Sequence, residues 1–248
     1  MSVKRNKEIK LIALDMDGTL LNENQEVSVA NREAIRRAEA KGVTVILSTG
    51  RSILTCYDYA KSLNLLSHLI TVNGSEIWEK EGKLLERNTV QTELIQWMWD
   101  LSQTYETQYW ATSSDNVWRN QMPDRIADHQ WLKFGFEIEN QKIRERVLKQ
   151  LLNQSKLEIS NSSPINIEIN AAGVNKGNAI EKVCKQLNLS MEHVMAIGDS
   201  LNDMAMIKKS GLGIAMGNAQ TVVKESADWV TAVNNEDGVA EAINTWVL

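Results

Sequence analysis

The sequence contains few of the residues that would place it outside ordinary globular proteins. Only two prolines and two cysteines occur among its 248 residues. The cysteines, Cys56 and Cys184, fall inside expected helices and in no spacing typical of a disulfide scaffold, a zinc site or a redox motif. We therefore expect both to be small buried hydrophobic residues of a protein in a reducing compartment.

Long apolar runs and a strong charge bias are missing as well. No segment approaches the roughly 18 consecutive apolar residues that a membrane span needs. The apolar stretch after the basic residues 1–5 is interrupted at Asp15, too early for a signal peptide. The net charge of −5 disfavours nonspecific binding to nucleic acid. These absences predict a cytoplasmic protein with neither a membrane nor a nucleic-acid partner.

Apolar strand patterns alternate with amphipathic helix patterns at both ends of the chain. In the first third we expect strands at 9–14, 43–47 and 69–72, helices at 28–41 and 52–63, and a hairpin of 76–78 with 84–86. From residue 175 onwards we expect helices at 176–187, 201–210, 219–226 and from 236, and strands at 193–197, 212–216 and 229–230. This alternation predicts an α/β fold with a Rossmann-like parallel sheet and helices on both of its faces.

The middle of the chain has a different character. It holds both prolines and five of the eight tryptophans, and an amphipathic helix is expected at 92–105, with Leu94, Met98, Leu101 and Tyr105 on one stripe. We predict a discontinuous core of residues 1–85 and 170–248, with residues 86–169 inserted as an α+β cap domain. Core packing is the favoured explanation of the tryptophans, with ligand stacking as the alternative.

Two carboxylates stand at the end of the first expected strand. Asp15 and Asp17 are two residues apart, so their side chains point the same way in an extended segment. The carboxyl ends of parallel strands are where ligands bind in open α/β sheets. A turn rich in Asp and Gly is the structural alternative, but Gly18, Thr19 and Leu20 complete a more specific motif.

Polar groups also mark the ends of two other expected elements. Thr49 and Gly50 follow the strand at 43–47, where a hydroxyl and a free amide at a helix N-terminus can bind an anion. Helix N-capping alone would also explain this pair. Lys176 opens the helix at 176–187, where its charge opposes the helix dipole, so propensity does not account for it. Both positions are therefore candidate anion-binding residues.

A further cluster runs from Gly198 to Asp203, after the strand at 193–197. Ser200 and Asp203 form a capping-box pattern, which leaves Asp199 and Asn202 unexplained. Four carboxylates at one edge of the sheet would need a compensating cation, and oxygen ligands favour Mg²⁺, which also coordinates phosphate. The sequence therefore predicts a site for Mg²⁺ and a phosphoryl group, made of Asp15, Asp17, Thr49, Lys176, Asp199, Asn202 and Asp203.

These motifs, in this order, resemble those of the haloacid dehalogenase-like (HAD) phosphatases. The signatures are Asp15-Met16-Asp17-Gly18-Thr19, Thr49-Gly50-Arg51, Lys176 and Gly198-Asp199-Ser200-Leu201-Asn202-Asp203. The Cof-type branch with a C2B cap (type IIB) is similar in finer features: Val72-Asn73-Gly74, the segment 213–219 and the segment 235–240. At roughly 85 residues, the inserted segment is short for that branch.

The resemblance implies a role for each matching residue. Asp15 would be the nucleophile that forms an aspartyl-phosphate, and Asp17 the general acid and base. Mg²⁺ would be held by Asp15, Asp199 and the main-chain carbonyl of Asp17, with Asp203 orienting waters or the lysine. The residues that would bind the phosphoryl oxygens are Thr49, Gly50, Lys176 and Asn202.

The expected activity is hydrolysis of a small phosphorylated metabolite, such as a sugar phosphate. A phosphomutase of the phosphomannomutase type and a phospho-ligand sensor without turnover remain as alternatives. Within residues 86–169, the candidate readers of the leaving group are Arg119, Arg125 and Lys133, together with nearby tryptophans. The protein is expected to be a monomer or a homodimer.

Overall fold

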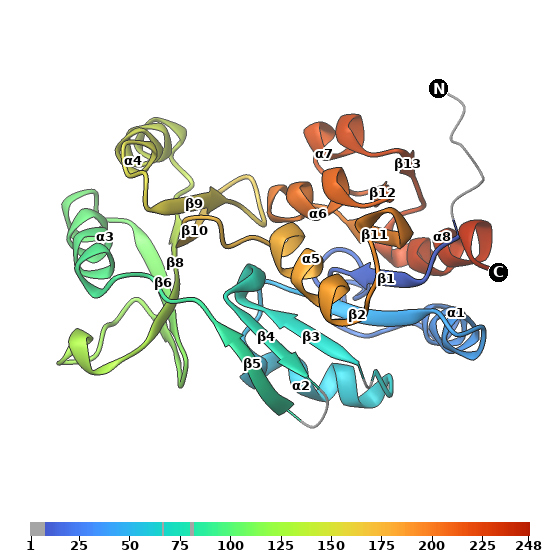
Figure 1. The fold of residues 1–248 in the computed structure, drawn as a ribbon. Coiled ribbons are helices and arrows are strands. Elements are labelled where there is room, and N and C mark those ends of the chain that lie inside the picture. The colour runs from blue at the N-terminus through green and yellow to red at the C-terminus, as the bar shows by residue number, and fades with distance from the viewer. Residues whose placement is uncertain (1–7, 66, 80–81) are drawn as a thin grey trace.

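A computed structural model describes residues 8–65, 67–79 and 82–248, and it contains two β-sheets (Figure 1). The basic residues 1–5 lie outside the described part of the chain. The larger sheet has eight strands in the order β13-β12-β11-β1-β2-β3-β4-β5. Their bounds are Leu11–Leu14 (β1), Thr44–Ser48 (β2), His68–Thr71 (β3), Glu76–Glu79 (β4), Lys83–Arg87 (β5), Val194–Gly198 (β11), Leu212–Ala215 (β12) and Trp229–Val230 (β13).

The strands from β13 to β3 are all parallel, whereas β4 and β5 form an antiparallel hairpin at one edge. The predicted parallel sheet and the hairpin are therefore both present. Because parallel strands are buried on both faces, their sequences are continuously apolar. In β1, Ile12 and Leu14 face one layer of helices, and Leu11 and Ala13 face the other.

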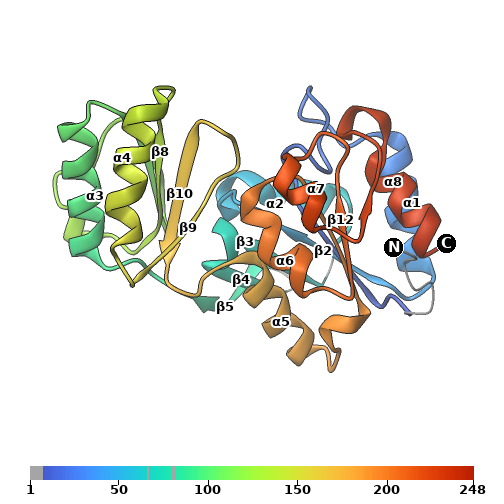
Figure 2. The same cartoon turned by 90° about the horizontal axis from the view of Figure 1, so that it is seen from above.

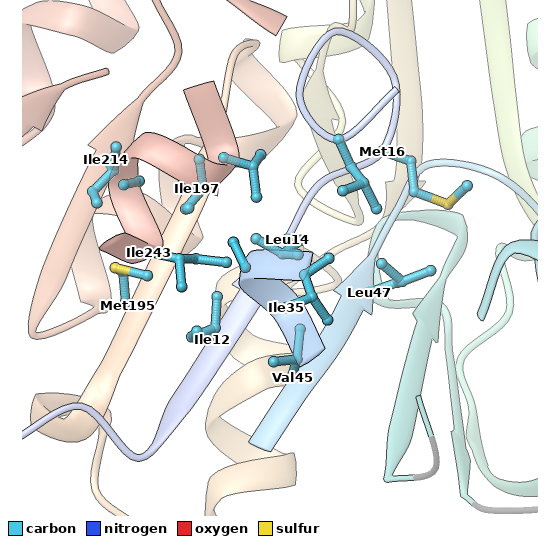
Figure 3. Close-up of a cluster of buried hydrophobic side chains, with 14 of the residues drawn as sticks. Ile12, Leu14, Met16, Ile35, Val45, Leu47, Met195, Ile197, Ile214 and Ile243 are labelled. Atoms are coloured by element: carbon cyan, nitrogen blue, oxygen red, sulfur yellow. The ribbon is translucent and has the colours of Figure 1, made fainter. Parts of the chain in front are cut away.

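Helices cover both faces of this sheet, as predicted. On one face, α1 and α8 pack together against Ile12, Leu14 and their neighbours (Figure 3). On the other face lies α5, whose buried side chains include Ile180 and Val183. The bounds are Val29–Ala40 (α1), Ile53–Ser62 (α2), Lys176–Gln186 (α5), Met204–Lys209 (α6), Thr221–Ser226 (α7) and Gly238–Trp246 (α8). Both cysteines are buried and free, as expected.

The helix predicted at 201–210 is interrupted. Leu201–Asp203 forms a 3₁₀ turn, and α6 begins only at Met204. The reason is local: the Asp203 carboxylate accepts hydrogen bonds from the backbone amides of Asp199 and Ser200, which closes a capping box. In the same way, the last helix begins at Gly238 and not at residue 236, because Asp237 adopts a left-handed conformation.

The smaller sheet is antiparallel and has five strands in the order β7-β6-β8-β10-β9. Two helices, α3 and α4, cover the face that points away from the larger sheet (Figure 2). The bounds are Thr92–Thr104 (α3), Gln108–Ser113 (β6), Val117–Arg119 (β7), Trp131–Glu137 (β8), Gln141–Leu152 (α4), Leu157–Ser160 (β9) and Asn166–Ala171 (β10). The strands β5 and β10 thus run two residues past the expected limits 85 and 169.

The smaller sheet has a hydrophobic core of its own beneath α3 and α4. In α3, Ile95 is fully buried, although the predicted stripe omitted it, whereas Leu94 and Tyr105, the residue after the helix, are only partly buried. Trp131 is buried in this core, and Trp97, Trp99 and Trp118 pack against it, as the core-packing explanation predicts. The helices in the described part of the chain all lack the combination of length and hydrophobicity that a membrane-spanning helix requires.

Candidate active site

Two strand ends bring Asp15 and Asp199 side by side. β1 and β11 are neighbouring parallel strands with Leu14 opposite Ile197, so the residues that follow them leave the same edge of the sheet. The Asp15 amide donates a hydrogen bond to the Ile197 carbonyl at 3.0 Å, which extends this pairing by one residue. The predicted meeting of the two carboxylates therefore follows directly from the strand order.

Lys176 lies between two carboxylates and is fully buried. Its Nζ is 2.6 Å from Asp15 Oδ1 and 2.7 Å from Asp203 Oδ1. Burial by itself lowers the pKa of a lysine, but the charges and hydrogen bonds of the two carboxylates outweigh it, so the pKa of Lys176 is raised. The ammonium is thus held charged at the start of α5, against the helix dipole.

Both carboxylate oxygens of Asp203 bond to neighbouring groups of the protein. One carboxylate oxygen contacts Lys176, and the other accepts from the amides of Asp199 and Ser200 at 2.9 and 3.1 Å. A Cβ on Gly198 would lie 2.4 Å from the Asp203 Cγ, so only glycine fits there. Asp203 therefore positions both the lysine and the loop that carries Asp199.

Negative charge is in excess at this point. Oxygen atoms of Asp15, Asp199 and Asp203 all lie within 4.8 Å of one another. Burial, followed by the charge of Asp203, raises the pKa of Asp199 to about 7. Burial, again followed by Asp203, also raises the pKa of Asp15 well above its usual value, although Lys176 opposes the shift. One lysine does not neutralise three carboxylates, and an oxygen-only donor set fits a hard divalent cation.

The neighbours of Asp199 orient its carboxylate towards Asp15. Ser200 Oγ donates to Asp199 Oδ2 at 2.9 Å, and Thr19 lies at 3.5 Å from Oδ1. Gly18 has a φ of +78°, and a Cβ there would lie only 2.6 Å from Asp199 Oδ2. The glycine therefore lets the chain turn after Asp17 and pass directly over the Asp199 carboxylate.

Asp17 stands apart from these carboxylates. Arg51 holds its side chain with two hydrogen bonds, at 2.8 Å from Nε and 2.5 Å from a terminal nitrogen, and Asp17 is half exposed. The same guanidinium bonds Gln25 and stacks on the Tyr59 ring at 5.3 Å. Sequence reasoning assigned no role to Arg51, although it belongs to the quoted Thr49-Gly50-Arg51 motif.

The predicted phosphate-binding residues differ in accessibility: Gly50 and Asn202 line a cavity between the two sheets, whereas Thr49 and Lys176 are fully buried. Thr49 is fully buried, and its hydroxyl accepts from the Arg51 amide at 3.1 Å. A Cβ on Gly50 would lie 3.0 Å from Asn73 Oδ1 and 3.6 Å from Asn202 Nδ2. A side chain at position 50 would therefore crowd the amide of Asn73.

The two sheets meet at a buried polar junction that sequence reasoning missed. Lys133 of β8 donates to the Gly50 carbonyl at 2.8 Å and lies 3.2 Å from Glu168 of β10. Asn73 donates to the other oxygen of Glu168 at 2.7 Å, with Asn202 at 3.5 Å. Although burial opposes it, the charge of Lys133 and the hydrogen bonds lower the pKa of Glu168. The Val72-Asn73-Gly74 motif was the feature of the sequence that could have pointed to this junction.

A cavity of about 480 Å³ opens between the two sheets at this junction. The larger sheet contributes Asp15, Asp17, Gly50, Arg51, Asp199 and Asn202, among others. The face of the smaller sheet that carries no helices contributes the other wall, with Trp110, Thr112, Arg119, Lys133, Glu137 and Glu168. Two of the expected readers, Arg119 and Lys133, therefore line the cavity. Arg125 does not: its exposed side chain pairs with Asp128.

Comparison with known proteins gives a consistent result. The family model described as haloacid dehalogenase-like hydrolase matches residues 12–149 and 124–243. The chain is 57% identical, over the full length of both proteins, to 5-amino-6-(5-phospho-D-ribitylamino)uracil phosphatase YcsE of Bacillus subtilis (strain 168). It is 30% identical to phosphatase YwpJ of the same organism, over 94% of this chain and 98% of that one.

Solved structures agree with these relatives. The structure of a haloacid dehalogenase-like hydrolase from B. subtilis superposes with a TM-score of 0.88 at 26% identity. The match covers 95% of this chain and 99% of that one. Phosphatases of this family use a metal ion. The resemblance drawn from the motifs is thus confirmed, and the chain belongs to the haloacid dehalogenase-like hydrolase family of phosphatases.

Proposed function

We propose that this phosphatase is Mg²⁺-dependent and hydrolyses a small phosphomonoester through an aspartyl-phosphate on Asp15. The observation that carries the proposal is the position of Asp15. One of its oxygens is held by Lys176 at 2.6 Å, and its carboxylate lines the cavity between the sheets. Asp15 is thereby oriented by one ion pair while its other oxygen remains available for attack on phosphorus.

In the proposed reaction, an Asp15 oxygen attacks phosphorus in line, and the bond from phosphorus to the leaving oxygen breaks. Asp17 protonates the leaving oxygen, then takes a proton from the water that attacks the aspartyl-phosphate. Hydrolysis releases inorganic phosphate and regenerates the Asp15 carboxylate. For this cycle, the Asp17 side chain has to exchange its contact with Arg51 for one with the substrate.

The Mg²⁺ ion would be held by Asp15, Asp199 and the main-chain carbonyl of Asp17, with Asp203 orienting the surrounding groups. When bound, the ion supplies positive charge that offsets the repulsion between the nucleophile and the phosphoryl group. Thr49, Gly50, Lys176 and Asn202 would hold the phosphoryl oxygens. The excess of carboxylate charge around Asp199 supports this assignment.

We assign residues 1–85 and 170–248 to the catalytic core and residues 86–169 to a cap that reads the leaving group. The polar junction of Lys133, Glu168 and Asn73 supports this division, because it places the helix-free face of the smaller sheet over the nucleophile. A closed cap excludes bulk water from the reaction.

For the substrate, we propose a ribityl phosphate that carries an aminopyrimidine ring, as in the name of the 57% identical relative. A phosphomutase would need a second basic phosphate site on the cap side. Arg119 and Lys133 are the basic residues that the smaller sheet brings to the cavity wall, and Lys133 is already paired with Glu168. The cavity therefore favours hydrolysis over a mutase reaction.

The test is a phosphate-release assay with Mg²⁺ on 5-amino-6-(5-phospho-D-ribitylamino)uracil, ribitol 5-phosphate and a panel of sugar phosphates. We expect release by the wild type without a bisphosphate activator, no release by Asp15→Asn, and loss of activity in EDTA. Equal release by Asp15→Asn and the wild type would refute the role of Asp15. Binding without turnover by the wild type would support the sensor alternative.

A further inference from the structure

Trp110 is the tryptophan of the smaller sheet that lines the cavity, and it lies directly over Gly135. The two residues are cross-strand partners in the pairing of β6 with β8. A Cβ on Gly135 would lie 2.2 Å from both Cε2 and Cζ2 of Trp110 and 2.6 Å from Cδ2. Any side chain at position 135 would push the indole off the strand. Glycine is therefore required for the indole to lie where it does.

The side-chain alternation of the strands explains why Trp110 faces the cavity. Tyr109 and Ala111 on β6, with Phe134 and Phe136 on β8, point into the hydrophobic core beneath α3 and α4. Trp110 lies on the opposite face, because successive residues of a strand alternate between faces. Core packing thus accounts for the neighbours of Trp110 and not for Trp110 itself.

Within the described part of the chain, the Trp110 side chain has no hydrogen-bond partner and no aromatic ring partner. Its indole nitrogen makes none of the hydrogen bonds found there, and it belongs to none of the aromatic ring pairs. By contrast, Trp118 and Trp131 donate to Ser113 and to the Ile126 carbonyl. With Gly135 beneath one face of the indole, the Trp110 side chain remains partly exposed and lines the cavity.

Two charged side chains flank this indole on the same wall. Arg119 is the cross-strand partner of Trp110 on β7, and Glu137 is two residues beyond Gly135 on β8. Within the described chain, neither is part of a salt bridge. A guanidinium donates hydrogen bonds and a carboxylate accepts them, so together they complement a ring that carries both carbonyl and N–H groups.

We propose that Trp110 and Gly135 form a stacking platform for a planar heteroaromatic ring of the leaving group, whose polar edge is read by Arg119 and Glu137. This inference rests on the proposed function and adds the residues that select the substrate. The stacking of nucleic-acid bases on aromatic side chains is a comparable interaction, in which the π-face of the base packs against the side chain.

The test compares a ring-bearing substrate, 5-amino-6-(5-phospho-D-ribitylamino)uracil, with ribitol 5-phosphate, which has the same polyol phosphate and no ring. Trp110→Ala should lower kcat/KM for the ring-bearing substrate by about 5- to 150-fold, the range of base–aromatic stacking. For ribitol 5-phosphate, the value should change by less than about twofold. Trp110→Phe should retain most of the activity, and Gly135→Ala should reproduce the loss with the indole still present.

Equal losses on the two substrates, or no loss on the ring-bearing one, would overturn the platform. A binding measurement separates this result from failure of the proposed function. Isothermal titration of the dephosphorylated product, 5-amino-6-(D-ribitylamino)uracil, should show a weaker Kd for Trp110→Ala than for the wild type. If that difference appears while no phosphomonoester is hydrolysed, the platform stands and the phosphatase assignment to this substrate fails. Unchanged binding overturns the platform whatever the kinetics.

Discussion

Replacing Lys176 with methionine should destabilise the protein more than the same replacement at an exposed lysine. Methionine keeps the length of the side chain but removes the charge that lies 2.6 and 2.7 Å from two carboxylates. Removing one partner of a buried ion pair typically costs about 3–5 kcal/mol, because the remaining charges stay buried and unpaired. We expect a loss of that size in the free energy of unfolding, measured by urea denaturation in EDTA at pH 8.

The same helix supplies a matched control. Lys182 of α5 pairs with Glu86, but its side chain is 46% exposed. An exposed pair contributes about 0–1 kcal/mol, so Lys182→Met should have little effect. If the two variants lose equal stability, the buried charge of Lys176 does not have the role that the structure assigns to it.

The loss should also depend on pH in a defined direction. Without Lys176, the pKa values of Asp15 and Asp199 rise further, because its charge lowers both in the wild type. A carboxyl whose folded pKa is raised destabilises the folded state as pH rises above its unfolded value of about 4. The deficit of Lys176→Met should therefore be larger at pH 8 than at pH 5. A deficit that does not change with pH would contradict the electrostatic explanation.

Two other predictions concern glycine and cysteine. Gly18→Ala should abolish phosphatase activity, because the added carbon would lie 2.6 Å from Asp199 Oδ2. The control is Gly42→Ala, at a φ of +82° with nothing within 4 Å, which should lower the free energy of unfolding by about 1–2 kcal/mol and retain activity. Inactivation by both substitutions would refute the steric argument. Burial raises the pKa of the Cys56 thiol to about 12 and that of the Cys184 thiol to about 11. Iodoacetamide at pH 8 should therefore modify neither cysteine in the folded protein and both in 8 M urea, as measured by mass spectrometry. Rapid labelling of the folded protein would contradict their burial.

Much of the architecture could be predicted from local patterns. The helix α1 begins after its N-cap Ser28 and is followed by Gly42 with a positive φ, as the sequence signals indicate. The interrupted helix at 201–210 was not predictable from periodicity alone. The sequence indicated the capping box of Ser200 and Asp203, but not that Leu201–Asp203 would form a 3₁₀ turn before α6 begins.

The sequence by itself determined the fold class and predicted which carboxylates gather at the ends of the parallel strands. Asp15 and Asp199 each directly follow an apolar strand, and the carboxyl ends of parallel strands lie at the same edge of a sheet. Local order along the chain was therefore enough to predict a common sheet edge for these groups, and their motifs suggested a chemistry, whereas the pairing of β1 with β11 brings the two carboxylates side by side.

Only the tertiary structure decided which groups hold Asp17 and which face the cavity between the sheets. The contact of Arg51 with Asp17 and the junction of Asn73 with Glu168 join residues 34 and 95 positions apart. Trp110 lies over Gly135 because the register of β6 and β8 places the glycine opposite it. Such pairings depend on how two separate sheets pack and on strand register, which no local propensity encodes.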